Sequence, residues 1–184
     1  MLIAKPIDTL LGMDEPDFSS ERELEAALVS VARDAVARDA VVVRGFGLDI
    51  AVFAPAGEGT VLRLMEVKAF SPHHGRCAFG NGKGGNQVGL LWDDAVGLPR
   101  SRNGLGVLDQ SIRWVIGHRG RSIGEPRYAF LNCTEVQQAA SGGVRAGKYN
   151  NIRLTGLAWI GWGELEQRVS AFLTTGEIHH SRQP

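Results

Sequence analysis

Three charged side chains stand close together in an otherwise apolar part of the sequence, residues 47–70. Asp49 precedes the run IAVFA, and Glu66 and Lys68 interrupt the run LRLMEVKAF. Side chains two residues apart on a β-strand project from the same face, so a strand here would point Glu66 and Lys68 the same way. Pairing with the preceding strand would bring Asp49 within several ångströms of them. Buried carboxylates are tolerated where they pair with a positively charged side chain or bind a metal cation.

These residue types predict a particular chemistry. Two carboxylates and a backbone carbonyl form a ligand set that suits Mg²⁺, because this ion takes oxygen ligands and keeps several waters. A lysine beside such an ion orients a water molecule or stabilises charge on a phosphate oxygen in the transition state. The alternative interpretation is an ion-pair ladder on the sheet surface without any metal, since strands often carry pairs with the Glu-x-Lys spacing.

The elements that position these residues follow from local patterns. Residues 19–40 read as an amphipathic helix that begins at Ser19 or Ser20, and Glu23 completes a capping box with Ser20. Its apolar residues recur at helical spacing, namely Leu24, Leu28, Val31 and Ala35. Three strands are then expected, over residues 40–47, 48–54 and 60–70, and the turn formers PAGEG join the last two.

The second half of the chain is less regular. Residues 71–106 are rich in glycine, and we expect an irregular insertion there with a short helix at 87–95. The expected elements beyond it are a helix at 107–119, a strand at 126–136, a loop at 137–150, a strand at 151–162 and a helix at 163–176. This order predicts an α/β sandwich with a central mixed sheet. The length favours a single domain, residues 19–184, after an irregular lead-in over residues 1–18.

The charged stretch resembles the core motif of a known family. The pattern GLDIAVF followed by LRLMEVKAF resembles that of the PD-(D/E)XK nuclease superfamily, in which an Asp opens one strand and E-x-K lies on the next. The upstream segments SERELEAAL and AVVVRGFG are similar to archaeal Holliday-junction resolvases and related repair nucleases. The likeness covers residues 19–70, with Leu48 in place of the usual proline before the Asp. It implies a restriction-endonuclease-like fold, a central mixed sheet flanked by helices in the order α-β-β-β-α-β, with a further strand and helix at the C-terminus.

The resemblance also implies roles for individual residues. Asp49 and Glu66 would be metal ligands together with the backbone carbonyl of Val67, and Lys68 would be the catalytic lysine. The implied cofactor is Mg²⁺, for which Mn²⁺ can substitute. Glu21 on the first helix would complete the metal site through a water molecule.

Other residues around this motif are candidates for supporting roles. Glu25 lies one helical turn after Glu21 on the same face and is a rival for its role. Arg44 would contact a phosphate near the scissile bond, and its alternative is a surface arginine on an edge strand. Arg76 and Lys83, in and beside the glycine-rich segment GNGKGG, would supply positive charge for DNA phosphates.

Many members of the superfamily carry a glutamine on the helix after the E-x-K strand. Gln87 is the nearer candidate in this sequence, and we take it as the catalytic one. Gln110 is the alternative, because it lies on the expected helix at 107–119 and forms the pattern Gln-x-x-x-Trp with Trp114. Either glutamine is equally well explained as an exposed polar residue.

The sequence as a whole thus predicts a metal-dependent DNA endonuclease, a hydrolase acting in DNA repair or defence. Two alternatives stay open, a catalytically inactive DNA-binding or assembly module of the same fold and a metal-free structural protein. The 20 basic and 20 acidic residues cancel, so DNA must be bound by a local patch. A homodimer is expected where two strands are cut. Two cysteines, no signal peptide and no apolar run long enough for a membrane favour the cytoplasm.

Overall fold

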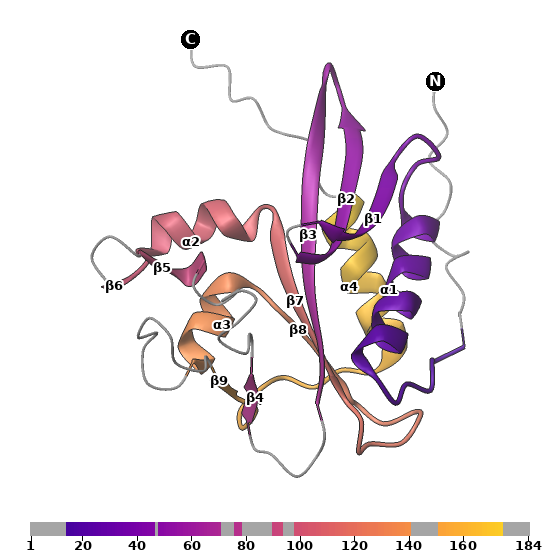
Figure 1. Cartoon of the computed structure of the whole chain (residues 1–184), viewed down its shortest axis with the longest axis vertical. Coiled ribbons are helices and arrows are strands. Elements are labelled where there is room, and N and C mark those ends of the chain that lie inside the picture. Colours follow the sequence, from indigo (N-terminus) through magenta and orange to yellow (C-terminus); the bar gives the residue numbers. More distant parts are fainter. Residues whose placement is uncertain are drawn as a thin grey trace.

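The computed structural model describes residues 14–46, 48–70, 76–78, 90–93, 98–140 and 151–174 (Figure 1). The helices are α1 (Glu21–Ala35), α2 (Arg102–Asp109), α3 (Cys133–Ala139) and α4 (Trp162–Thr174). The main strands are β1 (Val41–Phe46), β2 (Leu48–Ala56), β3 (Gly59–Phe70), β7 (Ile112–His118) and β8 (Tyr128–Leu131). Short strands complete the description: β4 (Arg76–Ala78), β5 (Trp92–Asp93), β6 (Leu98–Pro99) and β9 (Asn151–Arg153).

The main sheet has five strands in the order β1-β2-β3-β7-β8. The first three form an antiparallel meander, β7 runs parallel to β3, and β8 returns antiparallel to β7. The hairpin of β2 and β3 is long and projects beyond the helices at the top of Figure 1. The expected α/β architecture with a mixed sheet between helices is confirmed.

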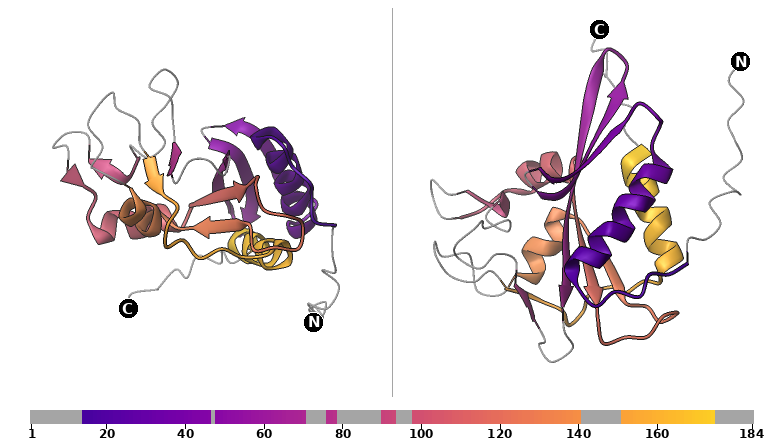
Figure 2. Two further views of the ribbon diagram at one scale, coloured as in Figure 1. Left: turned by 90° about the horizontal axis from the view of Figure 1, so that it is seen from below. Right: turned by 45° about the vertical axis from the view of Figure 1, so that its right-hand side comes forward.

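Two apolar cores lie on the two faces of this sheet. Figure 2 shows α1 and α4 side by side on one face, with α2 and α3 on the other. The first core joins α1 and α4 to β2 and β3, and its members include Leu24, Leu28, Ile50, Met65 and Val169. The second joins α2 and α3 to β7 and β8, and its members include Leu105, Trp114, Ile116, Leu131 and Val136. The sheet is therefore covered on both faces over its β7 and β8 half.

The first helix begins as the sequence predicts. The Ser20 side chain accepts a hydrogen bond from the backbone of Glu23, and the Glu23 carboxylate accepts one from the backbone of Ser20. This capping box satisfies amide groups that would otherwise lack partners. The helix ends at Ala35 rather than near residue 40, because Val36 is already extended.

The helix expected over residues 107–119 is wrong. Helix α2 covers residues 102–109, and the rest of that stretch is strand β7. Trp114 and Ile116 point into one core while Val115 points into the other. A strand buried on both faces is a nearly continuous apolar run, so its alternation is hidden, and the run was misread as helical.

Three other boundaries also differ from expectation. The strand predicted at 126–136 ends at Leu131, because Asn132 caps α3 through a second capping box with Glu135. The strand predicted at 151–162 shortens to β9, and Ile160 only bridges to Tyr128. In the short helix predicted at 87–95, residues 92–93 form β5, and residues 87–89 and 94–95 lie outside the described residues.

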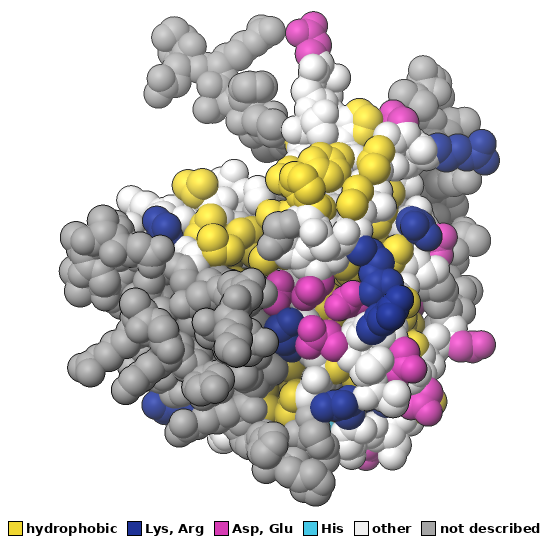
Figure 3. Space-filling view, viewed as in Figure 1, with side chains coloured by type: hydrophobic (Ala, Val, Ile, Leu, Met, Phe, Trp, Pro, Cys, Tyr) yellow, Lys and Arg dark blue, Asp and Glu magenta, His cyan; other side chains and the backbone are white. Residues whose placement is uncertain are grey.

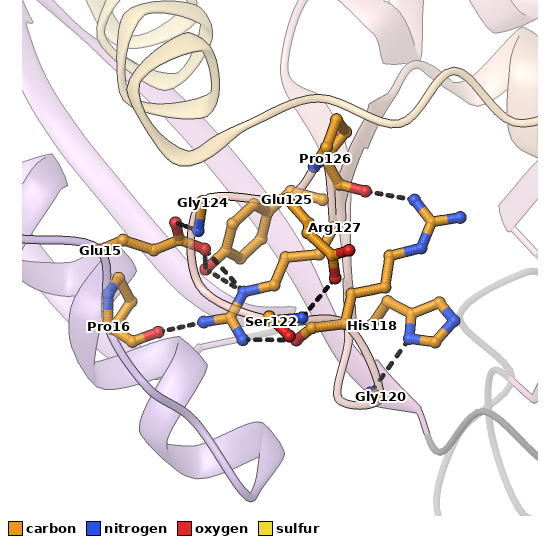
Figure 4. A network of polar contacts seen from close by, with 11 residues as sticks. Glu15, Pro16, His118, Gly120, Ser122, Gly124, Glu125, Pro126 and Arg127 are labelled. Atoms are coloured by element: carbon orange, nitrogen blue, oxygen red, sulfur yellow. Dashed lines mark hydrogen bonds and ion pairs between the residues drawn. The ribbon is translucent and has the colours of Figure 1, made fainter.

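A buried arginine fastens the segment before α1 to the sheet (Figure 4). Arg127, only 2% exposed, donates from Nε to Oε1 of Glu15 at 2.7 Å and from Nη2 to the carbonyl of Pro16 at 2.5 Å. Its guanidinium also lies over the ring of Phe18, 4.7 Å from the centroid. Because Phe18 directly precedes the capped start of α1, this network sets where the helix begins on the sheet.

None of the helices in the described ranges combines the length and apolar character that a bilayer span requires.

Candidate functional site

The three residues singled out in the sequence meet where β2 begins beside the middle of β3. The recorded β2–β3 register includes Ile50 opposite Met65, so the next pair along the strands is Asp49 beside Glu66, on one face. Oδ2 of Asp49 accepts a hydrogen bond from the backbone N–H of Val67 at 2.7 Å. The side chain of Asp49 thus satisfies a backbone group where the β2–β3 ladder ends.

The backbone N–H and C=O of Val67 are directed toward Asp49 on β2. The N–H of Leu64 donates to the carbonyl of Ser111 just before β7, so even-numbered residues of β3 bond toward β7. Odd-numbered residues such as Val67 therefore direct both N–H and C=O toward β2. Since that N–H meets Asp49, the Val67 carbonyl lies along the same strand edge as the Asp49 carboxylate.

Glu66 is a carboxylate without exposed surface. Among the described residues, no donor forms a hydrogen bond with either of its side-chain oxygens, although the Lys68 ammonium stands at ion-pair distance, 3.0 Å from Oε1. Burial, together with repulsion from Asp49, outweighs the attraction of Lys68 and raises the pKa of Glu66 from 4.5 to about 7. A buried carboxylate with unmatched lone pairs is the kind of group that a cation would satisfy.

Lys68 is surrounded by carboxylates. Its Nζ lies 2.9 Å from Oε1 of Glu21 and 3.8 Å from Oδ2 of Asp49, in addition to the contact with Glu66. Burial alone would lower the pKa of Lys68, but the attraction of these carboxylates is larger and raises it above its ordinary value. Lys68 is therefore a fully protonated ammonium at neutral pH.

A second group of acids borders the first. Oxygens of Glu21, Glu25 and Asp49 all lie within 4.8 Å of one another, and each side chain is half-buried. Glu21 and Glu25 come from successive turns of α1, as the sequence predicts for residues on one helix face. Arg44 of β1 forms an ion pair with Glu25, and its own side chain is 40% exposed. Asp49 thus belongs to both groups of carboxylates. Figure 3 shows acidic side chains gathered at the centre of this face with basic side chains beside them.

This donor set fits a hard divalent cation. All of the candidate ligands are oxygens, from carboxylates and from the Val67 carbonyl, and such sites suit Mg²⁺ or Mn²⁺. The completely buried carboxylate of Glu66, which Lys68 approaches only at Oε1, supplies the independent reason to expect a cation there. The residues present therefore fit the metal that the sequence resemblance implies.

The remaining sequence candidates are not brought into this group by the described structure. Gln110 ends α2 as its C-cap, so it does not stand on the helix that was expected to carry it. Arg76 lies in β4, opposite Arg153 in the register, and only its backbone is described. Gln87 and Lys83 lie outside the described residues.

Two neighbours of the site were not anticipated. Trp114 lies beside Glu66 in the β3–β7 register and is completely buried, so it helps to exclude water from that carboxylate. The sequence signal for this contact was present in IRWVIGH but was read with helical spacing. The pairing of Arg44 with Glu25 was also missed, because it depends on how α1 crosses β1.

Comparisons with protein-family models, with curated proteins and with solved structures find no match to this chain. The likeness to the PD-(D/E)XK superfamily therefore stays a prediction that rests on the residues themselves.

Proposed function

We propose that this protein is a Mg²⁺-dependent DNA endonuclease of the PD-(D/E)XK type. One observation carries the proposal: Glu66 is completely buried beside Asp49, and among the described residues the Lys68 ammonium, 3.0 Å from Oε1, is the one donor group that its two carboxylate oxygens face. A cluster built only for stability would be expected to satisfy such oxygens with donors, because an unsatisfied buried carboxylate destabilises the fold.

The order of elements supports the restriction-endonuclease-like fold as part of this proposal. Helix α1 precedes an antiparallel meander of β1, β2 and β3, and α2 then precedes β7, which is parallel to β3. This is the α-β-β-β-α-β order that the resemblance implies. The short strands β4, β5 and β6 occupy the glycine-rich insertion between β3 and α2.

Each residue of the site has a role in the proposed reaction. Asp49, Glu66 and the carbonyl of Val67 would hold Mg²⁺, which when bound supplies an activated water and charge stabilisation at the phosphate. Lys68 would donate hydrogen bonds to the attacking water or to a non-bridging phosphate oxygen. The water oxygen would bond to phosphorus as the water loses a proton to solvent. The bond from phosphorus to the 3′ oxygen would break, and that oxygen would take a proton from solvent, which leaves a 5′-phosphate and a 3′-hydroxyl.

The α1 glutamates would orient these groups. Glu21 holds the Lys68 ammonium at 2.9 Å and would thereby aim it at the phosphate. Glu25 is the rival for the water-mediated metal role that the resemblance gives to Glu21, because Lys68 holds Glu21 whereas Glu25 pairs with Arg44. Arg44 positions Glu25 through their ion pair. Its expected phosphate contact remains a prediction.

The test compares the wild type with Asp49→Asn and Lys68→Met on supercoiled plasmid, single-stranded DNA and a four-way junction. Glu164→Gln is the matched control, because Glu164 is an exposed acid on α4 outside the site. In Mg²⁺ or Mn²⁺, wild type and control should cleave, and both site variants should be at least about 100-fold slower. EDTA should abolish cleavage, and the products should carry 5′-phosphates.

Two results would replace this proposal. DNA that is bound equally by all four proteins but never cleaved would identify a catalytically inactive DNA-binding module. Absence of DNA binding, together with a melting temperature that no divalent cation raises, would identify the cluster as a structural ion-pair network.

A further inference from the structure

An apolar row leads along the sheet toward the carboxylates. In the β2–β3 register Phe53 stands opposite Leu62 and Ala51 opposite Leu64, and the next pair on that face is Asp49 with Glu66. On the edge strand β1, Val41 and Val43 pair with Phe53 and Ala51 and so share the same face. This row is continuous with the candidate catalytic site.

Part of this face is open to solvent. The opposite face of β1, β2 and β3 is packed against α1 and α4, which bury Ile50, Val52 and Met65. On the open face Val41 is 55% exposed. Phe46 is 53% exposed, and its ring reaches Phe53 on this face because Gly45, with a φ of 71°, interrupts the alternation of β1 after Arg44. Figure 3 shows apolar side chains above the acidic cluster on the same side of the molecule.

Phe46 is the most prominent member of this face. Its ring centroid lies 5.3 Å from that of Phe53, with the rings inclined at 69°, so one ring supports the other edge-on. Phe46 pairs with Leu48, the residue directly before Asp49. The ring itself therefore lies over the Phe53 end of the row, four residues along β2 from the proposed metal ligand Asp49, which is roughly 13 Å at the strand rise.

The lack of positive charge on this face indicates which class of ligand it would bind. Among the described residues, the open face formed by Val41, Val43, Phe46, Phe53 and Leu62 carries no Lys or Arg, and the nearby Arg44 turns to the opposite side to pair with Glu25. An intact duplex presents phosphates and hides the faces of its bases, so it gains little from an uncharged aromatic surface. Unpaired bases present exposed π-faces that stack on aromatic side chains whatever the sequence.

We propose that Phe46 and the apolar row beside it bind unpaired nucleobases of a DNA strand that continues along the row until one of its phosphates reaches the carboxylates and Lys68. The substrate class is therefore single-stranded or locally unpaired DNA. This inference rests on the proposed nuclease function and adds its substrate. A second protein copy is the less suitable occupant, because a partner seated on this row would also cover Asp49 and Glu66.

Binding of labelled oligothymidine and of a blunt duplex, followed by fluorescence anisotropy with Ca²⁺ in place of Mg²⁺, tests this inference. Phe46→Ala should weaken oligothymidine binding by about 5-fold to 150-fold, the range that loss of one stacked base gives. Phe46→Tyr, which keeps the ring, should bind like the wild type. Ile123→Ala is the control, because Ile123 is 56% exposed but lies between β7 and β8, away from this face. Binding of the duplex should not change.

Three outcomes would overturn the inference: no effect of Phe46→Ala on oligothymidine, an equal effect on the duplex, or a wild-type dimer that Phe46→Ala dissociates in sedimentation. The nuclease proposal fails separately. Oligothymidine binding that depends on Phe46, without cleavage by any variant, would leave this binding site intact and remove the enzyme activity. Cleavage that needs Lys68 but does not change in Phe46→Ala would support the nuclease activity and remove the base-binding site.

Discussion

The ammonium of Lys68 lies 3.0 Å from Oε1 of Glu66, a carboxylate that is sealed from solvent. The same ammonium also contacts Glu21, and it lies 3.8 Å from Asp49. Lys68 therefore supplies the positive charge that these carboxylates need when no divalent cation is bound. A cation held by Asp49 and Glu66 would share that task with Lys68.

This relationship predicts how Lys68→Met behaves in the absence of DNA. In EDTA, at a pH above 7 where Glu66 is ionised in the wild type, the variant should be less stable by about 3–5 kcal/mol, because Glu66 must then stay charged without its partner or take up a proton. Added Mg²⁺ should raise the melting temperature of Lys68→Met more than that of the wild type, since the cation replaces the missing ammonium. Thermal unfolding measured over a Mg²⁺ titration checks both expectations.

A second variant shows whether the added Mg²⁺ acts at this site. Combining Lys68→Met with Asp49→Asn should abolish the extra rise in melting temperature, because a proposed ligand is lost. An equal response of the double variant would place the bound Mg²⁺ elsewhere on the protein.

The raised pKa of Glu66 predicts a stability that depends on pH. Between about pH 4.5 and about pH 7 the folded protein retains a proton on Glu66 that the unfolded chain has released. The contribution of this group is therefore complete below pH 4.5 and is lost as the pH rises through 7. The loss amounts to up to about 3 kcal/mol for a shift of this size.

Denaturant unfolding of the wild type and Glu66→Gln in EDTA measures this effect. The free energy of unfolding of Glu66→Gln, relative to that of the wild type, should increase as the pH rises from 4.5 to 7. A constant difference across this range would mean that Glu66 titrates near its ordinary pKa in the folded protein.

The sequence predicted those parts of the site that depend on local rules. The capping box of Ser20 and Glu23 lies within one helical turn, and the alternation of β3 places Glu66 and Lys68 on one face whatever packs around them. The position of Asp49 beside Glu66 follows from the β2–β3 hairpin, because its short turn sets the register.

The remaining features depend on contacts between distant parts of the chain. Strand β7 lies inside the sheet and is apolar on both faces. The alternation that would identify the strand containing Trp114 is therefore hidden in the sequence. The pair of Arg44 and Glu25 forms only because α1 crosses β1 at that point. Long-range packing of this kind overrides local patterns, and it is also what buries Glu66 and raises its pKa.

Gly117 of β7 is predicted to be essential for the close packing of α1 against the sheet. A Cβ atom at this position would lie 2.6 Å both from Cδ2 of Leu24 and from Cζ of Phe18. Gly117→Ala should therefore destabilise the protein by about 1–3 kcal/mol, the usual cost of overpacking. Because Leu24 is one turn from Glu21, the displaced helix should also reduce cleavage. Denaturant unfolding and the plasmid assay measure the two effects.

Gly106 of α2 provides the control for Gly117. Its Cβ position is open, so Gly106→Ala should leave cleavage unchanged and stabilise the protein by about 0.5–1 kcal/mol. Equal stability of Gly117→Ala and the wild type would show that α1 does not pack closely on β7.

Arg127 is predicted to hold the start of α1 through its buried network. Arg127→Met would leave Glu15 and the carbonyl of Pro16 without their partner, and Glu15 is itself 10% exposed. Loss of one member of a buried ion pair costs about 3–5 kcal/mol, and we expect a decrease of this size in denaturant unfolding.

A double variant and a surface control separate this buried pair from an ordinary ion pair. Arg127→Met combined with Glu15→Met should recover part of the lost stability, because the unpaired carboxylate is removed as well. Arg168→Met breaks an exposed pair on α4, with 46% of the arginine side chain exposed, and should cost less than about 1 kcal/mol. If Arg127→Met costs no more than Arg168→Met, water must reach the guanidinium of Arg127. The segment before α1 would then have to be held by Phe18 and its apolar contacts alone.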